Sequence, residues 1–380
     1  MPDPNAIPRT PNPDDEPGLR LRAEDKLGIL KPLAIVPYRS MGLPSLFHVL
    51  GRVTEAPSEE GTLDGVEDGS VLANARATVH RMTADEIPGV SLRATLGTSA
   101  DETRTDGEGF FAFDLAPDPP AGSGWHDVRV EWLRGIGEPL ETAVTAEVLV
   151  PPKDAALAVV SDVDDTIIET HSSDLVEQAT LLLKHTGKTR PAIAGMSAFY
   201  RALAAGPDRM PTDADAAGTG NPVFYVSRTG WNLYDLFVAF MDANGYPKGP
   251  LFLRDLRWIE KRSAVVGRTN HKFERIDTLI RAYPELPFVL VGDSGMHDPG
   301  LYAELVEKHP GRVKAVYIHN VTGDDREREL DAVGRRMVAA GASLLVAEES
   351  TAFAQHAADH GLVHPDAPGY VQRGAEQDRA

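Results

Sequence analysis

The stretch Leu157-Ala-Val-Val-Ser-Asp-Val-Asp-Asp-Thr166 places acidic side chains directly after a short apolar run. An apolar run of this length without alternation is typical of a strand that is buried on both faces of a sheet. Asp162 and Asp164 therefore stand where the strand ends. Open α/β sheets bind their ligands beyond the carboxyl ends of the strands, so both aspartates are candidate functional residues.

Similar apolar runs recur along the rest of the chain, and segments with helical periodicity separate them. The further strands are expected at 223–226, 251–253, 288–291, 313–318 and 344–346. The helices are expected at 174–186, 195–205, 231–244, 270–283, 298–309, 325–340 and 351–361. Repeated strand and helix units predict an α/β domain with a doubly wound parallel sheet.

A different pattern precedes this domain, in which short strands with alternating polarity follow one another without an amphipathic helix. These strands are expected at 47–54, 77–82, 89–95, 102–105, 110–115, 128–132 and 146–150. The turn Asp106-Gly-Glu-Gly109 is suited to a tight hairpin between two of them. The pattern predicts an antiparallel β-sandwich, either Ig-like or prealbumin-like.

The domain boundaries follow from these changes in pattern and from the Pro151-Pro152 pair. We expect a disordered or loosely docked arm at 1–27, where Pro and acidic residues dominate. The sandwich is expected at 28–152, the α/β domain at 153–365 and a flexible tail at 366–380.

Composition excludes several classes of function. The chain of 380 residues has no cysteine, which excludes disulfides, thiolate zinc sites and cysteine nucleophiles. A net charge of -19 disfavours nucleic acid as a partner and, without a basic amphipathic segment, gives no evident attraction to an anionic membrane. Neither a membrane span nor a signal peptide is evident, so the cytoplasm is the expected location.

Polar side chains also follow the other strands of the α/β domain. Ser227 follows the second strand, Asp293 follows the fourth, and Lys272 lies near the start of a helix between the third and fourth. Mg²⁺ prefers oxygen ligands and takes one or two carboxylates beside phosphate and water, so Asp162 and Asp293 are candidate ligands. Asp164 can add its backbone carbonyl. These residues predict a magnesium site at one edge of the sheet.

The same residues suit the transfer of a phosphoryl group. The Asp162 carboxylate can attack phosphorus, and Asp164 can protonate the leaving oxygen and later deprotonate water. Ser227 and Lys272 can hold the phosphate oxygens, and Arg228 can add positive charge there. Each residue alone has an ordinary alternative: Thr166 as a partner of local amides, Ser227 as a cap and Lys272 as a solvated helix residue. Their order at successive strand ends favours the chemical interpretation.

These motifs resemble the haloacid dehalogenase-like superfamily. The quoted segments are Asp162-Val-Asp-Asp-Thr166, Ser227, Lys272 and Gly292-Asp-Ser-Gly-Met-His-Asp298. The resemblance implies that Asp162 is the nucleophile, that Asp164 is the acid/base, and that Asp162, Asp164 and Asp293 surround Mg²⁺. It also implies that Asp298 lies just outside the ligands and positions a water or Lys272, with Thr166 likewise behind the site.

A narrower resemblance concerns the phosphatidate phosphatase catalytic domain of the actin-patch-associated type. It is carried by Ser161-Asp-Val-Asp-Asp-Thr-Ile167, Phe224-Tyr-Val-Ser227, Gly249-Pro-Leu251, His271-Lys-Phe-Glu-Arg-Ile276 and Gly292-Asp-Ser-Gly295, and covers about 159–322. In the family, the second strand is followed by Ser-x-Ser-Pro. This chain instead has Ser227-Arg-Thr-Gly230, so Thr229 replaces the second serine and Gly230 replaces the proline. It also has His319 where the family often has Arg, and a structural role for this histidine is expected.

The resemblance implies a Mg²⁺-dependent phosphatase that acts through an aspartyl phosphate, with phosphatidate at a membrane surface as substrate and diacylglycerol as product. Two alternatives stay open. The substrate is a soluble phosphomonoester, such as a sugar or nucleotide phosphate, or the chain is a binding protein with a vestigial phosphatase fold. The presence of all four motifs argues against the second alternative. The partner of the expected sandwich is not indicated by the sequence.

Overall fold

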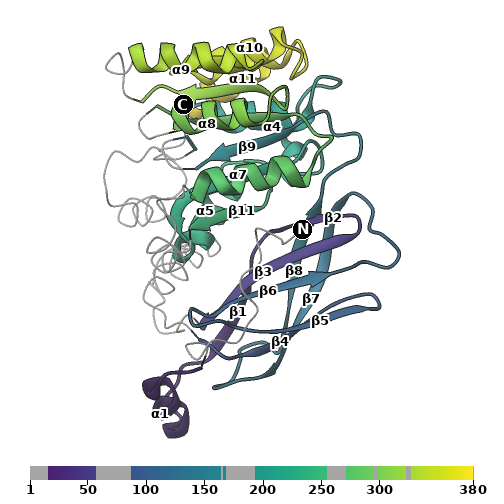
Figure 1. Cartoon of the computed structure of the whole chain (residues 1–380), viewed down its shortest axis with the longest axis vertical. Helices are drawn as coiled ribbons and strands as arrows, with labels where there is room; N and C mark the ends of the chain where they lie inside the picture. Colours follow the sequence, from purple (N-terminus) through teal and green to yellow (C-terminus); the bar gives the residue numbers. More distant parts are fainter. Residues whose placement is uncertain are drawn as a thin grey trace. The chain divides into compact units, whose positions relative to one another are not determined.

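The computed structural model describes residues 16–56, 87–163, 166–167, 193–254, 271–294, 298–321 and 327–379. Contacts divide the chain into two units, Met1–Pro151 and Pro152–Ala380, each with its own sheet (Figure 1). No helix among the described residues is long and apolar enough to cross a lipid bilayer.

The first unit is built on a mixed sheet. Its eight described strands are β1 (Leu33–Pro37), β2 (Ser40–Leu43), β3 (Leu46–Glu55), β4 (Ser91–Leu96), β5 (Ser99–Arg104), β6 (Phe110–Leu115), β7 (Gly124–Arg134) and β8 (Ala143–Val150). They are ordered β1-β3-β2-β8-β7-β4-β5, with β6 paired to β3. Neighbours are antiparallel except β2 and β8, which are parallel. One apolar cluster, including Phe47, Phe113 and Val148, forms the core.

The strand pairing in this unit differs from the pairing expected for an antiparallel sandwich. The strands form one connected sheet, because the parallel pair β2 and β8 joins strands that are far apart in the sequence. β5 also lies against β6, where Ser99 Oγ donates to the Ala116 carbonyl at 2.5 Å. The turn at 106–109 is not a hairpin between paired strands, since β5 pairs with β4 and β6 pairs with β3. β1 and β2 were not predicted, and the strand expected at 77–82 lies outside the described residues.

The arm expected at 1–27 is described only from residue 16, and there Leu19–Leu27 form helix α1 where a disordered or loosely docked segment was predicted. The helix ends at Gly28, which has a φ of 66° and whose N–H donates to the Asp25 carbonyl at 3.0 Å. Leu21 is the buried residue of the helix, and the Gly137 N–H donates to Asp25 Oδ1 at 2.8 Å. A single buried leucine in a short helix is too weak a pattern to be recognised from sequence.

The second unit contains a fully parallel sheet of six described strands. They are β9 (Ala158–Asp162), β10 (Val223–Gly230), β11 (Leu251–Arg254), β12 (Phe288–Asp293), β13 (Val313–His319) and β14 (Ser343–Ala347). All six predicted strands are confirmed. The order is β11-β10-β9-β12-β13-β14, so the direction of strand addition reverses at β9. Ligands bind at such a reversal, beyond the carboxyl ends of the strands.

Helices flank this sheet on both sides (Figure 1). The described α-helices are α4 (Met196–Ala205), α5 (Tyr234–Ala243), α7 (His271–Ala282), α8 (Asp298–Lys308), α9 (Glu327–Ala339), α10 (Ser350–Asp359) and α11 (Ala367–Arg379). Short 3-10 segments occur at Asp213–Ala217 and Trp231–Leu233. α7, α8 and α9 pack in succession, while α4, α10 and α11 pack as a second group. The helix expected at 174–186 lies outside the described residues.

The C-terminal segment is the clearest departure from the expected domain limits. Residues 366–380 were expected to be a flexible tail, but Ala367–Arg379 form α11, which packs on α4 and α10. Its buried residues, Ala367, Val371 and Ala375, recur every four positions. Asp378 Oδ2 accepts a hydrogen bond from the Gly195 N–H at 2.9 Å, which fixes the far end of α11 to the start of α4.

Candidate active site

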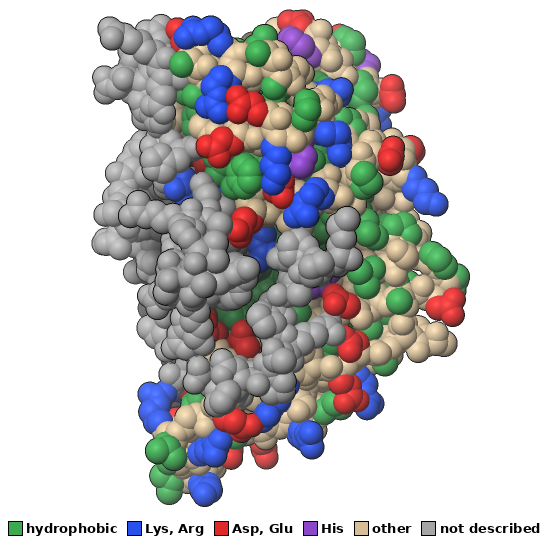
Figure 2. All heavy atoms as spheres, in the orientation of Figure 1, with side chains coloured by type: hydrophobic (Ala, Val, Ile, Leu, Met, Phe, Trp, Pro, Cys, Tyr) green, Lys and Arg blue, Asp and Glu red, His purple; other side chains and the backbone are tan. Residues whose placement is uncertain are grey.

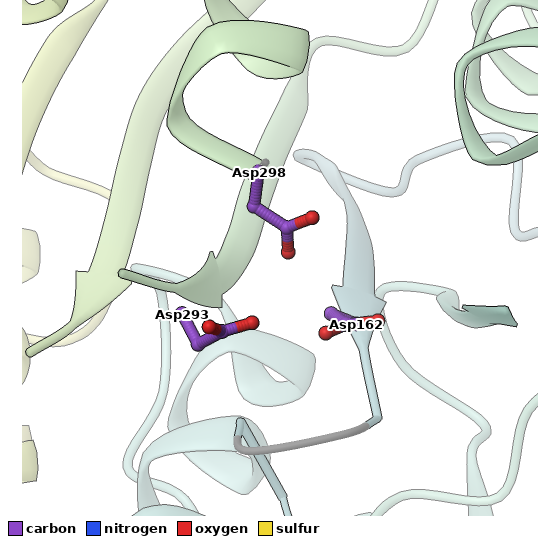
Figure 3. A group of neighbouring side chains, drawn as sticks. All are labelled: Asp162, Asp293 and Asp298. Carbon is purple, nitrogen blue, oxygen red and sulfur yellow. The ribbon is translucent and has the colours of Figure 1, made fainter. Parts of the chain in front are cut away.

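Three buried aspartates converge at the carboxyl edge of the parallel sheet. Asp162 ends β9, Asp293 ends β12, and Asp298 is the first residue of α8. Each offers a carboxylate oxygen within 4.8 Å of the others, and Figure 3 shows the three side chains facing one space. Their residue exposures are 3%, 0% and 0%. Burial of like charges at this spacing is unfavourable unless a cation offsets them.

Lys272 supplies part of that positive charge. It lies in the first turn of α7 and is only 1% exposed. Its Nζ is 2.9 Å from Asp162 Oδ1 and 2.5 Å from Asp298 Oδ2. Burial alone lowers the pKa of Lys272, but the charges of Asp162 and Asp298 outweigh this and raise it above its usual value. The lysine therefore stays protonated and bridges two elements of the site.

The strand register brings Ser227 to the same edge. Val226 of β10 pairs with Asp162 of β9, so Ser227 lies one residue beyond that pair, toward the carboxyl end. Its side chain is buried, and its Oγ accepts a hydrogen bond from the Thr229 N–H at 2.9 Å. The pairing of β10 with β11 is irregular between Val226 and Gly230. Such irregularities turn side chains out of the regular pleat and often adjoin functional sites.

Arg228 approaches the site from this irregular segment. Its Nη2 is 3.7 Å from Asp298 Oδ1, and its side chain is 29% exposed. Both atoms are buried and make no hydrogen bond within the described part of the chain. The guanidinium can therefore still donate a hydrogen bond to an anion, and the Asp298 oxygen can still accept one or ligate a cation.

The space around position 292 is too crowded for a side chain, which explains why a glycine precedes Asp293. A Cβ at this position would lie 2.6 Å from Asp298 Oδ2 and 2.8 Å from Tyr302 Cε2. The Tyr302 hydroxyl donates to the Val291 carbonyl at 2.9 Å, and the Lys272 ammonium lies 5.6 Å from the centre of the Tyr302 ring. Burial, followed by the nearby charge of Asp298, raises the pKa of Tyr302, which therefore stays a neutral wall of the site.

Sequence reasoning missed Tyr302 and a second tyrosine, Tyr200. The Tyr200 hydroxyl contacts Ser161 Oγ, and Ser161 Oγ donates to the Asp162 carbonyl at 2.5 Å. Burial raises the pKa of Tyr200, so the phenol is protonated and donates to the serine. The pair holds the backbone of Asp162 from behind the sheet. Neither tyrosine carries a sequence signal, because each lies at a buried position of an ordinary helix.

Three further residues singled out by the sequence are Thr166, Asp164 and His319. Thr166 is buried and its Oγ1 makes no hydrogen bond within the described residues, while Asp164 lies outside them. His319 pairs in register with Asp293, and its Nε2 is 3.2 Å from the Glu348 carbonyl. That contact gives the histidine a structural partner in the loop after β14.

The donor set fits a hard divalent cation. In their ionised forms, the three carboxylates outweigh the two cations Lys272 and Arg228. Carboxylate oxygens are the donors that Mg²⁺ prefers, and no nitrogen or sulfur ligand belongs to the described group. The geometry therefore permits a cation, an attacking carboxylate and a basic cradle for an anion within one buried site.

Comparisons with known proteins agree with this geometry. Residues 157–320 match the family model described as the catalytic domain of phosphatidate phosphatase APP1. The chain is 26% identical over 187 residues to phosphatidate phosphatase APP1 of Saccharomyces cerevisiae. The aligned region covers 49% of this chain and 29% of that protein. The chain is also 26% identical over 172 residues to an uncharacterised protein of Schizosaccharomyces pombe, covering 44% and 26%. The chain thus spans under a third of the length of either relative.

A solved structure with a weaker likeness is a carbohydrate acetylesterase from Xanthomonas citri. The alignment covers 90% of this chain and 74% of that chain, with 10% identity and a TM-score of 0.28. A score this low supports no conclusion about the fold or chemistry of the present chain.

Proposed function

We propose that this chain is a Mg²⁺-dependent phosphatase that converts phosphatidate to diacylglycerol and inorganic phosphate; the match of residues 157–320 to the phosphatidate phosphatase catalytic-domain model supports this. One observation carries the proposal: Asp162, Asp293 and Asp298 are buried together at the reversal point of a parallel sheet, around a buried lysine. We also propose that the second unit is a doubly wound haloacid dehalogenase-like domain. Its parallel strand order and two layers of helices support this assignment.

Asp162 and Asp293, with the backbone carbonyl of Asp164, are the proposed holders of Mg²⁺. When bound, the ion supplies positive charge that offsets repulsion between the carboxylate nucleophile and the anionic phosphate. Asp298 adjoins the ligands and binds Lys272 directly. Asp298 therefore positions the ammonium against Asp162.

The proposed first step is attack by an Asp162 carboxylate oxygen on phosphorus. A new P–O bond forms as the bond to the glycerol oxygen breaks, which gives an aspartyl phosphate and releases diacylglycerol. Lys272, 2.9 Å from Asp162 Oδ1, stabilises the ionised carboxylate before attack. Asp164 donates the proton that the leaving oxygen needs.

The proposed second step restores Asp162. Asp164, now ionised, removes a proton from water, and the water oxygen attacks the aspartyl phosphate at phosphorus. The P–O bond to Asp162 breaks and inorganic phosphate leaves. Ser227, Arg228 and Lys272 donate to the phosphate oxygens during both steps, as charge is redistributed over them.

The decisive variant is Asp162→Asn, which keeps the shape of the side chain and removes its nucleophilic charge. We expect loss of Mg²⁺-dependent phosphate release by at least about 10³-fold, with an unchanged circular dichroism spectrum. Asp331→Asn, at an exposed position of α9, is the matched control and should retain wild-type turnover. Wild-type turnover by Asp162→Asn would refute the nucleophile and with it the proposed mechanism.

The substrate is tested separately, because the soluble alternative uses the same residues. Phosphate release is measured from phosphatidate in mixed micelles and from a panel of sugar and nucleotide phosphates, with Mg²⁺ and with chelator. A higher kcat/KM for phosphatidate supports the lipid assignment. Turnover of soluble phosphates alone replaces the lipid with a soluble phosphomonoester. The expected location, in the cytoplasm with peripheral contact to membranes, stays a prediction.

A further inference from the structure

Helix α1 carries an outward face that contains apolar and basic side chains only. At about 100° per residue, Leu19, Ala23 and Leu27 lie along one side of the helix. Arg22 and Lys26 flank them on one edge and Arg20 on the other. All six side chains are exposed. We call these six residues the α1 face.

The apolar members of the α1 face are unusually exposed. Leu19 is 89% exposed and Leu27 is 72% exposed, and Ile29, just beyond the helix, is 65% exposed. These three have the highest exposures among the large apolar side chains of the described residues. Leu140, at 61%, belongs to a segment that hydrogen-bonds to the adjoining strand through the Leu33 carbonyl. Concentration of such side chains at one place marks an interaction site rather than ordinary surface.

The opposite side of α1 fixes the helix to its unit, so the exposure of the α1 face has a structural origin. Leu21 is buried, and Asp25 Oδ1 accepts from the Gly137 N–H at 2.8 Å. The C-terminal end is closed by the N–H groups of Gly28 and Ile29, which donate to the Asp25 and Glu24 carbonyls at 3.0 Å each. The helix therefore presents Leu19 and Leu27 outward while its other side is occupied.

The charges of α1 are sorted in the same way. Its acidic residues, Glu24 and Asp25, fall outside the α1 face. Glu24 lies 3.6 Å from Arg20 at the border, Arg22 Nη2 lies 3.2 Å from Glu16 Oε2, and Lys26 makes no ion pair with the described residues. Figure 2 shows green and blue side chains side by side over α1, at the lower left of the view. Leu19, Leu27 and the ammonium of Lys26 are thus exposed on one helix of a chain whose net charge is -19, where no basic amphipathic segment was expected from the sequence.

We propose that the α1 face docks the first unit on a lipid bilayer whose surface carries anionic headgroups. Leucines beside arginine and lysine are the pattern of a helix that lies in a membrane interface, with its apolar side chains among the acyl chains and its cations at the phosphates. A second copy of the chain fits less well, because the α1 face has cations at both edges and no carboxylate of its own to pair with the cations of a copy. The choice of an anionic bilayer rests in part on the proposed phosphatidate substrate.

The charge of the whole chain predicts the character of this contact. The net charge of -19 repels an anionic surface, so attachment depends on the local cations and on insertion of Leu19 and Leu27. Such a helix is too short for permanent attachment, and reversible binding is expected. Without the leucines, the cations should not hold the chain on the bilayer.

The test is co-sedimentation of the full chain with vesicles, in the Asp162→Asn background to prevent turnover. The vesicles contain phosphatidylcholine alone, or phosphatidylcholine with phosphatidate or with phosphatidylserine. We expect binding to both anionic vesicles and weak binding to phosphatidylcholine. Leu19→Ser/Leu27→Ser and Arg20→Gln/Lys26→Gln should each reduce binding by about tenfold or more. Val338→Ser, at a 64% exposed site on α9, is the matched control and should bind normally.

The outcomes separate this inference from the proposed function. Equal vesicle binding by the leucine variant and wild type would overturn the inference, as would a wild-type dimer that this variant converts to a monomer. Binding to vesicles with phosphatidate but not to vesicles with phosphatidylserine would assign the contact to the active site. That result would also overturn the inference. Vesicle binding through α1 without phosphatidate hydrolysis would leave the inference standing and reject the lipid substrate. An unchanged circular dichroism spectrum and an unchanged thermal transition of the first unit confirm that the leucine variant is folded.

Discussion

Lys272 is a lysine with almost no exposure, and its ammonium joins Asp162 of β9 to Asp298 of α8. Replacement by Met keeps most of the volume but leaves the buried carboxylates without their bridging charge. We expect Lys272→Met to lower the free energy of unfolding by about 3 to 5 kcal/mol and to abolish turnover. Urea unfolding and phosphate release measure the two effects. Lys314→Met, on an exposed position of β13, is the control and should change neither.

Added Mg²⁺ should restore part of the stability of Lys272→Met without restoring activity. The cation replaces the missing charge, but it does not replace the ammonium beside Asp162. Stability that is indifferent to Mg²⁺ would show that the carboxylates do not share a cation site.

Gly292 offers a second test at the residue scale. In Gly292→Ala, the new methyl would lie 2.6 Å from Asp298 Oδ2, so the Asp298 side chain or the Tyr302 ring must move. We expect a stability loss of about 1 to 3 kcal/mol and a larger relative loss in kcat, because Asp298 holds Lys272. Gly300→Ala is the control, since a Cβ there has no neighbour within 4 Å. A wild-type kcat in Gly292→Ala would contradict the positioning role of Asp298.

The sequence identifies those site residues that stand at strand ends. Asp162 and Asp293 follow apolar runs, and parallel strands bring their carboxyl ends to one edge. Contacts that depend on side-chain packing cannot be predicted in this way. The Asp298 contact to Lys272 joins two helix starts and was expected only from the family resemblance, and Tyr200 reaches Ser161 across the face of the sheet. No periodicity encodes either distance.

At the scale of elements, Asp277 connects α7, which carries Lys272, with the end of α8. Asp277 Oδ1 lies 2.8 Å from Lys308 Nζ and 2.7 Å from His309 Nε2, and Oδ2 lies 3.0 Å from Arg281 Nε. Burial alone raises the pKa of Asp277, but hydrogen bonds from Lys308 and His309 outweigh it and lower the pKa below the ordinary 3.8. The ionised form is therefore favoured by folding.

The lowered pKa gives a prediction with a definite sign. The stability from Asp277 is fully present above its ordinary pKa and is lost as the pH falls through the lowered value. We expect Asp277→Asn to cost about 1 to 3 kcal/mol at pH 7, and the difference from wild type to shrink below about pH 4. Urea unfolding at a series of pH values measures this difference. Asp331→Asn should give no such trend, and a difference for Asp277→Asn that is constant with pH would contradict the ion pairs.

The elements that were predicted are defined by neighbouring residues in the sequence. The features that were missed depend on contacts between distant residues or on weak local patterns. All six strands of the parallel sheet are apolar runs, and local sequence is sufficient to predict them. The parallel pairing of β2 with β8 depends on strands about a hundred residues apart, so it escapes local analysis. α11 has a readable spacing at Ala367, Val371 and Ala375, but Pro368 and two glycines weaken its helical propensity.

At the scale of the whole molecule, the two units divide the proposed work. The carboxylates lie in Pro152–Ala380 and the α1 face lies in Met1–Pro151. The net charge of -19 would oppose approach to an anionic bilayer at any random orientation. A local basic and apolar face on the first unit would therefore select how that unit meets the membrane, and the proposed hydrolysis belongs to the second unit.

The presence of two compact units also predicts how Mg²⁺ affects thermal unfolding. Each unit has its own sheet and core, so calorimetry should resolve two transitions. Mg²⁺ binds the folded carboxylate group only, and at a hundredfold excess over its Kd it adds about 2.7 kcal/mol to the stability of that unit. For a unit of this size the shift in Tm is roughly 5 to 10 °C. The other transition should not move.

Two variants identify the transitions. Asp277→Asn lowers the Tm of the unit that contains α7, so it marks the transition of the second unit. Asp293→Asn removes one candidate ligand and should abolish the Mg²⁺ shift of that same transition. If Mg²⁺ instead shifts the other transition, or shifts both equally in Asp293→Asn, the ion binds outside the carboxylate group. The assignment of Mg²⁺ to Asp162 and Asp293 would then be wrong, whatever the substrate of the enzyme.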